Sequence, residues 1–583
     1  MDFLENIVNT LSAYIWDRGI PVGDQEIPWV VIALLGTGLF LTVRLGFLQL
    51  RELGHGFAVT SGIYDDPAEP GDVSHFQALT TALSATVGIG NIAGVALAIH
   101  WGGPGALFWM WITALVGMAT KYSEVTLAQR YRDVEKDLDP YKWEGTVSGG
   151  PMYYIERGLG LAWRPLAIFF ATLLGTTAFL TGNAIQANTV ADTLNTTFSV
   201  PVWVSGLITA TVVALVVIGG ITRIGRVTGV LAPTMAAIYV LGALTIILMN
   251  ADRVIPTFGL IFREAFNPTA SVAGSGTGIF LLTMMWGVKR GLFSNEAGQG
   301  SAPIAHAAAK TDEPVSEGVV ALLEPFIDTI VICTMTGLVI IMTGVWNATI
   351  PTEITLDRGD ISYMVGRAEG GYRDLETETE IRIEAGRYVE SGAGAARLAW
   401  HEVPVEALYL DAEQTQPFDG VIDTEGDIAI AVDGTRITSL YGNAVESGAP
   451  LTMLAFQRGL PGEWGKFIVV LSVFLFAIST AIAWSYYGDR CANYLFGHQA
   501  VLPYKFAFVT MHFVGAILTL AVVWTLGDVF LGIVILPNLL ALLLLSGKVA
   551  LETKSYFARK PWIENREVHR RLREERRRRR AER

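Results

Sequence analysis

The sequence is poor in charged residues and almost free of cysteine. Only 17% of its 583 residues are charged and 51% are hydrophobic, whereas soluble proteins carry about 25% charged residues. This balance excludes an ordinary soluble domain and predicts a polytopic membrane protein. The two cysteines, Cys333 in one apolar run and Cys491 just after another, do not suggest a disulfide framework.

The signatures of several protein classes are also missing. The eight histidines show no metal-ligand spacing, and no P-loop or dinucleotide fingerprint accompanies the apolar runs. These absences argue against a membrane enzyme or a nucleotide-driven pump, so we expect no enzyme activity and no cofactor. Residues 1–27 lack a basic start followed by an apolar run, and we expect no cleavable signal peptide.

Eleven apolar runs are close to, or longer than, the roughly 20 residues that cross the hydrocarbon core. The run at 277–300 is the least apolar, because charged residues lie in its second half, and we expect its helix to break near Trp286 and Gly287. The predicted spans are 28–49, 76–100, 104–130, 165–191, 201–220, 228–250, 277–300, 316–346, 464–487, 503–525 and 529–548.

The distribution of lysine and arginine predicts the orientation. One side, assigned to the cytoplasm, receives the basic segments 50–75, 131–164, 221–227, 301–315 and 488–502 and the tail 549–583. The other side receives the N-terminus, 251–275 and 347–463. We therefore expect a multi-pass protein of the cell (inner) membrane. The tail fits either binding to anionic lipid head groups or a simple topology anchor, and a nucleic-acid partner is not expected.

The segment 347–463 has a character of its own. Between Ile350 and Leu460 it holds 20 acidic residues against 8 arginines and no lysine, a net formal charge of −12. Alternating runs such as 381–384 and 428–432, separated by Asp-Gly and Glu-Gly turns, predict a small β-rich insertion. This extracytoplasmic insertion is either a lid or partner site over the outer entrance, or a solvated loop that tolerates extra length.

The stretch 84–103 lies within an apolar span but is interrupted by Gly88, Gly90 and Asn91. Backbone that leaves helical geometry inside a bilayer needs polar partners, so such a break is typical of a cavity or a ligand site. The alternative is that Gly90 and Gly94 form a small-residue packing face.

The chain divides into halves that share this plan. After the first span, 76–250 and 277–548 each begin with a glycine-interrupted helix and contain five crossings. Five is an odd number, so the halves must have opposite orientations, as in the inverted repeats of secondary transporters. The predicted organisation is an N-terminal segment with one helix (1–75), two five-helix repeats, the insertion in the second repeat, and a basic cytoplasmic tail (549–583).

Three strings of the sequence indicate a family. Residues 86–96, 291–303 and 479–488 resemble strings of the alanine or glycine:cation symporter family. Supporting matches lie at 102–105, 121–124, 149–154 and 537–538. The resemblance covers nearly all of 76–548 and implies an all-α, leucine-transporter-like fold of two inverted five-helix repeats, preceded by one extra helix. It also implies sodium-coupled uptake of alanine or glycine. The long insertion departs from the family.

The carboxylate and the ammonium group of a zwitterionic amino acid need different binding partners. Free N–H groups at the end of a half-helix suit the carboxylate, and the resemblance also places it at the first break, at Thr86, Gly88, Gly90 and Asn91. The ammonium needs acceptors, and the resemblance points to Thr480. Trp484 lies on the same helical face, where it closes the pocket or serves as an interfacial anchor.

A pocket wall filled by bulky protein side chains leaves room only for substrates with small side chains. The candidates, for which bundle packing is the alternative, are Phe179, Gln186, Met284, Met285 and Val288. The resemblance supports an aromatic residue, a glutamine and a methionine in this wall.

The sodium site and the gate are predicted in the same region. Ser479 and Thr480, with carbonyls around Ala85 and Gly88, resemble the cation site of transporters with this fold. The alternative is that the hydroxyls bond back to their own helix. A cytoplasmic gate is expected from Lys289 or Arg290 with Glu296, unless these side chains only reach to the interface.

Sodium is favoured over the proton because no Asp, Glu or His lies within the first break. The alternatives are proton-coupled transport, or a channel or receptor that uses the insertion as a sensor.

Overall fold

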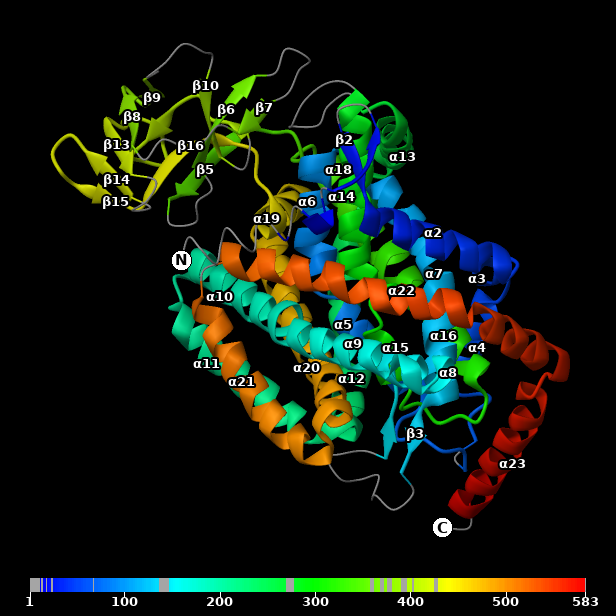
Figure 1. The fold of residues 1–583 in the computed structure, drawn as a ribbon. Coiled ribbons are helices and arrows are strands. Elements are labelled where there is room, and N and C mark those ends of the chain that lie inside the picture. Colours follow the sequence, from blue (N-terminus) through cyan, green and yellow to red (C-terminus); the bar gives the residue numbers. More distant parts are fainter. Residues whose placement is uncertain are drawn as a thin grey trace.

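The protein was analysed as a computed structural model, which describes residues 11, 14–16, 18–22, 25–66, 68–135, 146–268, 277–356, 361–366, 372–374, 380–389, 396–400, 403–423, 428–518 and 520–581. Residues 1–10 and 136–145 lie outside the described residues. Part of the expectations about the N-terminus and about the basic segment 131–164 concerns these residues. The described chain is mostly helical, and the strands between residues 350 and 444 gather at one end of the helical part (Figure 1).

The first half of the chain contains the elements up to residue 266. A short hairpin, β1 (Gly19–Val22) and β2 (Gln25–Pro28), precedes them, and β3 (Asp133–Val134) pairs with β4 (Val147–Ser148). The helical elements are α2 (Trp29–Arg44), α3 (Leu48–Arg51), α4 (Leu53–Thr60), α5 (His75–Thr86), η1 (Gly90–Gly94), α6 (Val95–Gly102), α7 (Ala106–Tyr131), α8 (Pro151–Leu159), η2 (Leu161–Trp163), α9 (Arg164–Phe179), η3 (Leu180–Ala184), α10 (Ile185–Phe198), α11 (Val202–Val217), α12 (Gly220–Met249) and α13 (Ala251–Phe266).

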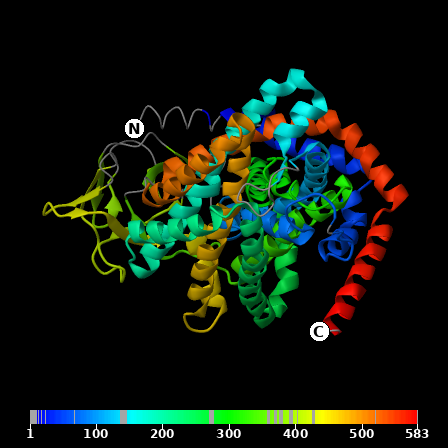
Figure 2. The same ribbon diagram turned by 90° about the horizontal axis from the view of Figure 1, so that it is seen from below.

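The second half begins with a continuous helix and ends with a long one. Its helical elements are α14 (Thr277–Asn295), α15 (Ala302–His306), α16 (Pro314–Ala321), α17 (Leu323–Pro325), η4 (Phe326–Cys333), α18 (Thr334–Met342), α19 (Gly448–Gly459), α20 (Trp464–Phe496), η5 (His498–Ala500), α21 (Val501–Ile517), α22 (Leu520–Arg559) and α23 (Trp562–Ala581). In Figures 1 and 2, α23 lies at the end of the molecule opposite to the strands.

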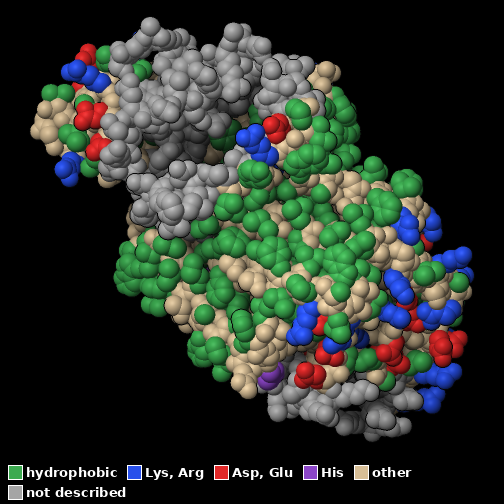
Figure 3. Space-filling model, viewed as in Figure 1, with side chains coloured by type: hydrophobic (Ala, Val, Ile, Leu, Met, Phe, Trp, Pro, Cys, Tyr) green, Lys and Arg blue, Asp and Glu red, His purple; other side chains and the backbone are tan. Residues whose placement is uncertain are grey.

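Six of the described helices are long and apolar enough to cross a membrane, and a bent pair adds a seventh candidate. The six are Leu161–Asn195, Gly220–Met249, Pro314–Met342, Trp464–Phe496, His498–Ile517 and Val529–Arg559, and the pair is His75–Thr86 with Gly90–Gly102. The other four predicted spans correspond to the shorter apolar helices α2 and α11 and to the helices α7 and α14. Hydrophobic side chains cover the middle of the helical part in Figure 3, as a bilayer requires.

The second helix break lies later than the sequence predicted. Helix α14 passes through Trp286 and Gly287 without interruption and ends at Asn295, so the predicted break there is wrong. Gly287 instead allows close packing on α7, because a Cβ atom there would lie 2.4 Å from the carbonyl oxygen of Ala106. The chain leaves helical geometry at Glu296, whose φ is +56°, and re-enters it in α15.

Helices also occupy segments that were expected to be loops. The stretch 251–275 contains α13, and the last apolar helix continues beyond 548 to Arg559. The basic tail is itself helical over α23. Within 347–463, where β structure was expected, α19 forms a helix that packs against η1 and α20.

Strands fill the described part of residues 350–444. They are β5 (Ile350–Thr355), β6 (Ile361–Gly366), β7 (Tyr372–Asp374), β8 (Glu380–Glu384), β9 (Arg387–Tyr388), β10 (Ala396–Trp400), β11 (Val403–Pro404), β12 (Leu408–Tyr409), β13 (Gly420–Asp423), β14 (Ile428–Ala431), β15 (Arg436–Ile437) and β16 (Ser439–Ala444). They form antiparallel sheets in the orders β11-β10-β6-β7, β12-β16-β5 and β15-β14-β13-β8-β9. Alternation in β8 buries Ile381 and Ile383 in a separate small core.

The C-terminal segment, from Arg559 onward, packs against the end of the helical part that faces away from the strands of residues 350–444. The ring of Trp562 lies 4.5 Å from that of His55 and 4.9 Å from that of Tyr556. Arg559 forms a two-bond ion pair with Glu313, at 2.6 and 2.9 Å. Aromatic contacts of this kind contribute beyond the area they bury.

Trp562→Ala should therefore loosen this end of the molecule. We expect a loss of about 1–3 kcal/mol of stability, because a half-buried indole and its ring contacts are removed. The measurement is thermal unfolding of the purified protein in detergent. The neighbouring Ile563→Ala is the control, since Ile563 is 53% exposed and should cost less than about 0.5 kcal/mol; equal losses for both variants would contradict the role of the aromatic cluster.

Candidate functional site

The first candidate site is the break between α5 and α6. The two arms, His75–Thr86 and Gly90–Gly102, are bent by 54°. The N–H of Gly88 donates to Oδ1 of Asn91 at 2.8 Å, and the N–H of Asn91 donates to the Gly88 carbonyl at 3.2 Å. Asn91 therefore closes the break from three residues away, which explains why an asparagine follows the glycines.

Asn91 also joins the first break to two other helices. Its Nδ2 donates to Oδ1 of Asp328 at 2.6 Å and to Oγ of Ser294 at 3.1 Å. The hydroxyls of Ser294 and Thr329 donate to Oδ2 of Asp328, at 2.6 and 2.7 Å. All four side chains are buried. A carboxylate thus lies at the break, contributed by η4 from a different part of the sequence.

Asp328 is the feature of the site that sequence reasoning undervalued. The first break itself contains no acidic residue, but the carboxylate reaches it from across the bundle. The signal available in the sequence was a charged residue deep in an apolar span, which marks a functional site by default. Its partner could not be identified without the fold.

The predicted cation-site residues come together between α5 and α20. The hydroxyl of Thr480 donates to the carbonyls of Ser84 at 3.1 Å and Ala85 at 3.3 Å. The hydroxyl of Ser479 approaches the Ser84 carbonyl at 3.3 Å and also bonds back to Phe476 at 2.9 Å. Gly88 lies against the same hydroxyl, because a Cβ atom there would be 2.6 Å from Oγ1 of Thr480. Hard oxygen atoms of this kind suit a sodium ion.

Trp484 links α20 to the second break. Its Nε1 donates to Oε1 of Glu296 at 3.0 Å, and Oε2 of Glu296 accepts from the hydroxyl of Ser301 at 2.5 Å. The indole is 1% exposed, which argues against an interfacial anchor. Gly182 of η3 lies directly on it, since a Cβ atom there would be 2.3 Å from Cγ of Trp484.

The loop of the second break is held by residues of other helices. The N–H of Gly300 donates to Oε1 of Glu124 at 3.1 Å, and Nδ2 of Asn538 donates to the carbonyl of Gly298 at 2.8 Å. The hydroxyl of Tyr154 donates to Oδ1 of Asn538. These contacts give a physical purpose to Glu124 and Asn538, which lie in two of the strings that carried the resemblance.

The residues proposed for the selective wall lie in several places. The ring of Phe179 contacts Tyr504 and Phe508 of α21, with centroids at 4.7 and 5.9 Å. Met284 and Val288 belong to a small cluster with Val31 of α2. The packing alternative describes these three.

The remaining two wall candidates are partly or wholly enclosed. Gln186 is buried, and its Nε2 donates to the Thr181 carbonyl at 3.1 Å. Met285 is half-buried.

The predicted gate residues have other neighbours. Lys289 lies over the rings of Trp16 and Trp286, at 5.0 and 5.6 Å, and Arg290 lies over that of Trp286 at 5.3 Å. The Glu296 carboxyl group instead interacts electrostatically with Lys121. The reason is the continuous helix, since Glu296 follows Arg290 by six positions, a rise of about 9 Å along α14.

Comparison with known proteins shows which family this chain resembles. The family model described as the sodium:alanine symporter family matches residues 1–370 and 419–570. The sodium/alanine symporter AgcS of Methanococcus maripaludis is 38% identical over 95% of this chain and 98% of its own. An uncharacterized transporter of Haemophilus influenzae is 36% identical, with 95% and 97% covered. A putative sodium/proton-dependent alanine carrier protein of Bacillus subtilis, YrbD, is 30% identical, with 95% and 92% covered.

Two glycines of the first broken helix provide a matched test of the site. Gly88→Ala would drive a methyl group into the Thr480 hydroxyl, whereas a Cβ atom at Gly94 would lie 4.0 Å from the Arg290 side chain. We expect Gly88→Ala to be less stable than Gly94→Ala by about 1–3 kcal/mol, the usual cost of overpacking. Thermal unfolding in detergent measures the difference. Equal stability of the two variants would show that α5 and α20 are not in contact at Gly88.

Proposed function

This chain belongs to the sodium:alanine symporter family, and we propose that it takes up alanine or glycine together with sodium by alternating access. It is a cation-coupled amino-acid transporter of the membrane and not an enzyme. The observation that supports the sodium and substrate assignments best is the convergence of Ser479 and Thr480 on the carbonyl oxygens of α5, one turn before the break at Gly88.

The proposed architecture is the eleven-span one, with two inverted five-helix repeats after an extra first helix. In this architecture residues 347–463 lie on the extracytoplasmic side of the inner membrane, and the N-terminus lies on the same side. The basic end with α23 faces the cytoplasm. Figure 3 supports this axis, because hydrophobic side chains separate the strand-bearing end from a charged end.

In the proposed transport site the amino-acid carboxylate binds at the first break, at Thr86, Gly88, Gly90 and Asn91. Its entry would replace the bond between Asn91 and the Gly88 N–H by bonds to the ligand. Thr480 would face the ammonium group and Trp484 would close the pocket. Sodium would take the oxygens of Ser479 and Thr480 with the carbonyls near Ala85 and Gly88.

The driving force is large enough for accumulation. One positive charge that crosses about 100 mV releases about 2.3 kcal/mol, and a tenfold sodium gradient adds about 1.4 kcal/mol. A proton would supply the same electrical term. Proton coupling is the second candidate, because the Asp328 carboxylate lies against Asn91 and one relative carries a sodium/proton-dependent name.

Uptake of labelled L-alanine into proteoliposomes tests the proposal directly. We expect uptake to require a sodium gradient and to rise with an inside-negative potential, and a proton gradient alone to give much less. Asn91→Ala should reduce uptake at least about tenfold, because the break loses the side chain that closes it. Asn195→Ala is the matched control, since Asn195 only bonds the Val200 carbonyl at an exposed helix end. Equal uptake with sodium absent would favour the proton instead.

Thr480 offers a separate test of the cation site. Thr480→Val keeps the shape of the side chain and removes the hydroxyl, so we expect the sodium concentration for half-maximal uptake to rise at least about tenfold, or about 1.4 kcal/mol. Thr480→Ser keeps the oxygen and should remain within about threefold of the wild type. Equal sodium dependence of the two variants would remove Thr480 from the cation site.

A further inference from the structure

Five buried ionisable side chains form a continuous series that the transport site does not use. We call it the buried row, and its members in spatial order are His75, Glu317, His306, Glu324 and Lys121. Nδ1 of His75 contacts Oε2 of Glu317, and Oε1 of Glu317 lies 2.5 Å from Nδ1 of His306. Nε2 of His306 lies 3.2 Å from Oε1 of Glu324, whose Oε2 lies 3.1 Å from Nζ of Lys121.

The hydrogen bonds of His306 require an additional proton. Both of its ring nitrogens face carboxylate oxygens, from Glu317 and Glu324. A neutral imidazole has one donor and one acceptor, and an ionised carboxylate only accepts. The ring must therefore be doubly protonated, or one of the two carboxyl groups must hold the proton. His75 shares this arrangement only in part, because one nitrogen contacts Glu317 but Asp65 lies 4.0 Å from the other, beyond hydrogen-bond length.

The buried row connects the two broken helices. His75 begins α5, the first arm of the first broken helix, and His306 ends α15, which follows the second break. Glu317 of α16 lies between the two rings, and Lys121 of α7 ends the row. These side chains are at most 4% exposed. A proton shared within the buried row therefore joins α5 to α15, the two helices that lie on the same side of the breaks.

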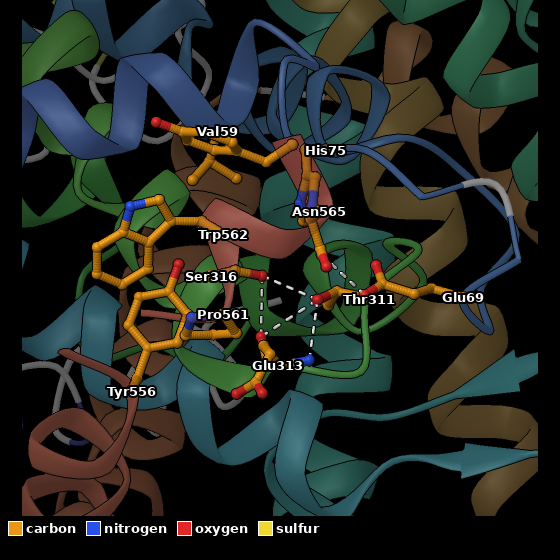
Figure 4. Close-up of a pocket in the computed structure, with 11 residues that line it drawn as sticks. Val59, Glu69, His75, Thr311, Glu313, Ser316, Tyr556, Pro561, Trp562 and Asn565 are labelled. Carbon is orange, nitrogen blue, oxygen red and sulfur yellow. Dashed lines mark hydrogen bonds between the residues drawn. The ribbon is translucent and has the colours of Figure 1, made fainter. Parts of the chain in front are cut away.

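A pocket opens beside the His75 end of the row. His75 lines it together with Glu69, Asn565 and Trp562, and its volume is about 270 Å³ including the part open to solvent (Figure 4). Nδ2 of Asn565 donates to Oε1 of Glu69 at 3.1 Å. Burial raises the pKa of Glu69 to about 7 and also raises the pKa of Asp65. The Glu69 carboxyl group at the mouth can therefore exchange protons near neutral pH.

Further charged groups face the ends of the row. At the His75 end they come from the loops around the pocket, from α23 and from the end of α7, and at the Lys121 end from α7 and the second break. They are Asp65, Glu69, Lys310, Asp312, His569 and Arg132 at the first end, and Glu124 and Glu296 at the second. The two imidazole rings are hydrogen-bonded to the carboxyl groups of Glu317 and Glu324.

We propose, on the basis of the transport function above, that the buried row is a proton-binding site filled from the pocket on the cytoplasmic side. The bound proton keeps α5 and α15 together and so holds the cytoplasmic side closed. When the proton leaves through the pocket to water, a carboxylate faces an imidazole nitrogen that no longer donates, and the arms separate more readily. The transporter is thereby slowed by cytoplasmic acid.

The test is alanine exchange in proteoliposomes with equal alanine, sodium and pH on both sides and no membrane potential. Two carboxylates favour the protonated row, so its proton is lost above neutral pH. Between pH values of about 7 and about 9 we therefore expect the wild-type rate to rise about tenfold. In His306→Gln, which cannot titrate, the rate should change less than about twofold. His55→Gln is the matched control, because His55 bonds Tyr556 beside the same pocket but lies outside the row; it should keep the wild-type profile.

A second readout does not depend on transport. The folded row holds a proton that the unfolded chain releases near neutral pH, so the thermal midpoint of the wild type should fall as the pH rises, and that of His306→Gln should fall less. If His306→Gln does not fold, Glu324→Gln serves instead, and its exchange profile should move to lower pH because one carboxylate that holds the proton is gone.

Parallel profiles of wild type and variant in both measurements would overturn the proton site. Failure of the wild type to exchange alanine at any pH would contradict the proposed function instead, and the thermal midpoints would then decide the row alone.

Discussion

The constraint on which the structure depends is that backbone polar groups inside a bilayer must find partners within the protein. Both helix breaks obey it. At the first break, Oδ1 of Asn91, in the same chain segment, accepts a hydrogen bond from the N–H of Gly88. At the second, Glu124 and Asn538 accept from and donate to the loop at Gly300 and Gly298. Glycine can leave helical geometry, but polar side chains at fixed positions make the departure stable in hydrocarbon.

The same constraint governs the buried charges. An isolated charge at membrane depth is costly, so ionisable side chains there are paired or serve a function. The Asp328 carboxylate accepts three hydrogen bonds from side chains of the first break, α14 and η4. Lys121 pairs with Glu324, and Asp489 pairs with Arg490 and Lys505. Because Lys121 and Glu324 lie on different helices, as do Asp489 and Lys505, each of these two pairs also fixes how the helices pack.

Sequence alone predicted those features that a local pattern encodes. The break at Gly88 and Asn91 was visible because polar and flexible residues interrupt an apolar run. The second break was misplaced because Gly287 has the same local appearance but serves close packing on α7. The position of Asp328 against Asn91, and that of Lys121 near Glu296, depend on contacts between distant segments, which no periodicity reveals. Helices α13 and α19 were missed because they lie in segments that were assigned as a whole to a loop and to the β-rich insertion.

The two breaks differ in how they are closed, and this sets which one can bend freely. The N–H of Gly88 bonds a side chain only three residues away, so rotation of α5 about this point keeps that bond. Gly298 and Gly300 bond α22 and α7, so the loop of the second break cannot move without those helices or without losing the bonds. Breaking a buried bond of this kind leaves a polar group unsatisfied, at a cost of about 1–3 kcal/mol. Helix α5 is itself restrained at both ends. Near the break the hydroxyls of Ser479 and Thr480 bond the Ser84 carbonyl, and at the far end His75 begins the buried row.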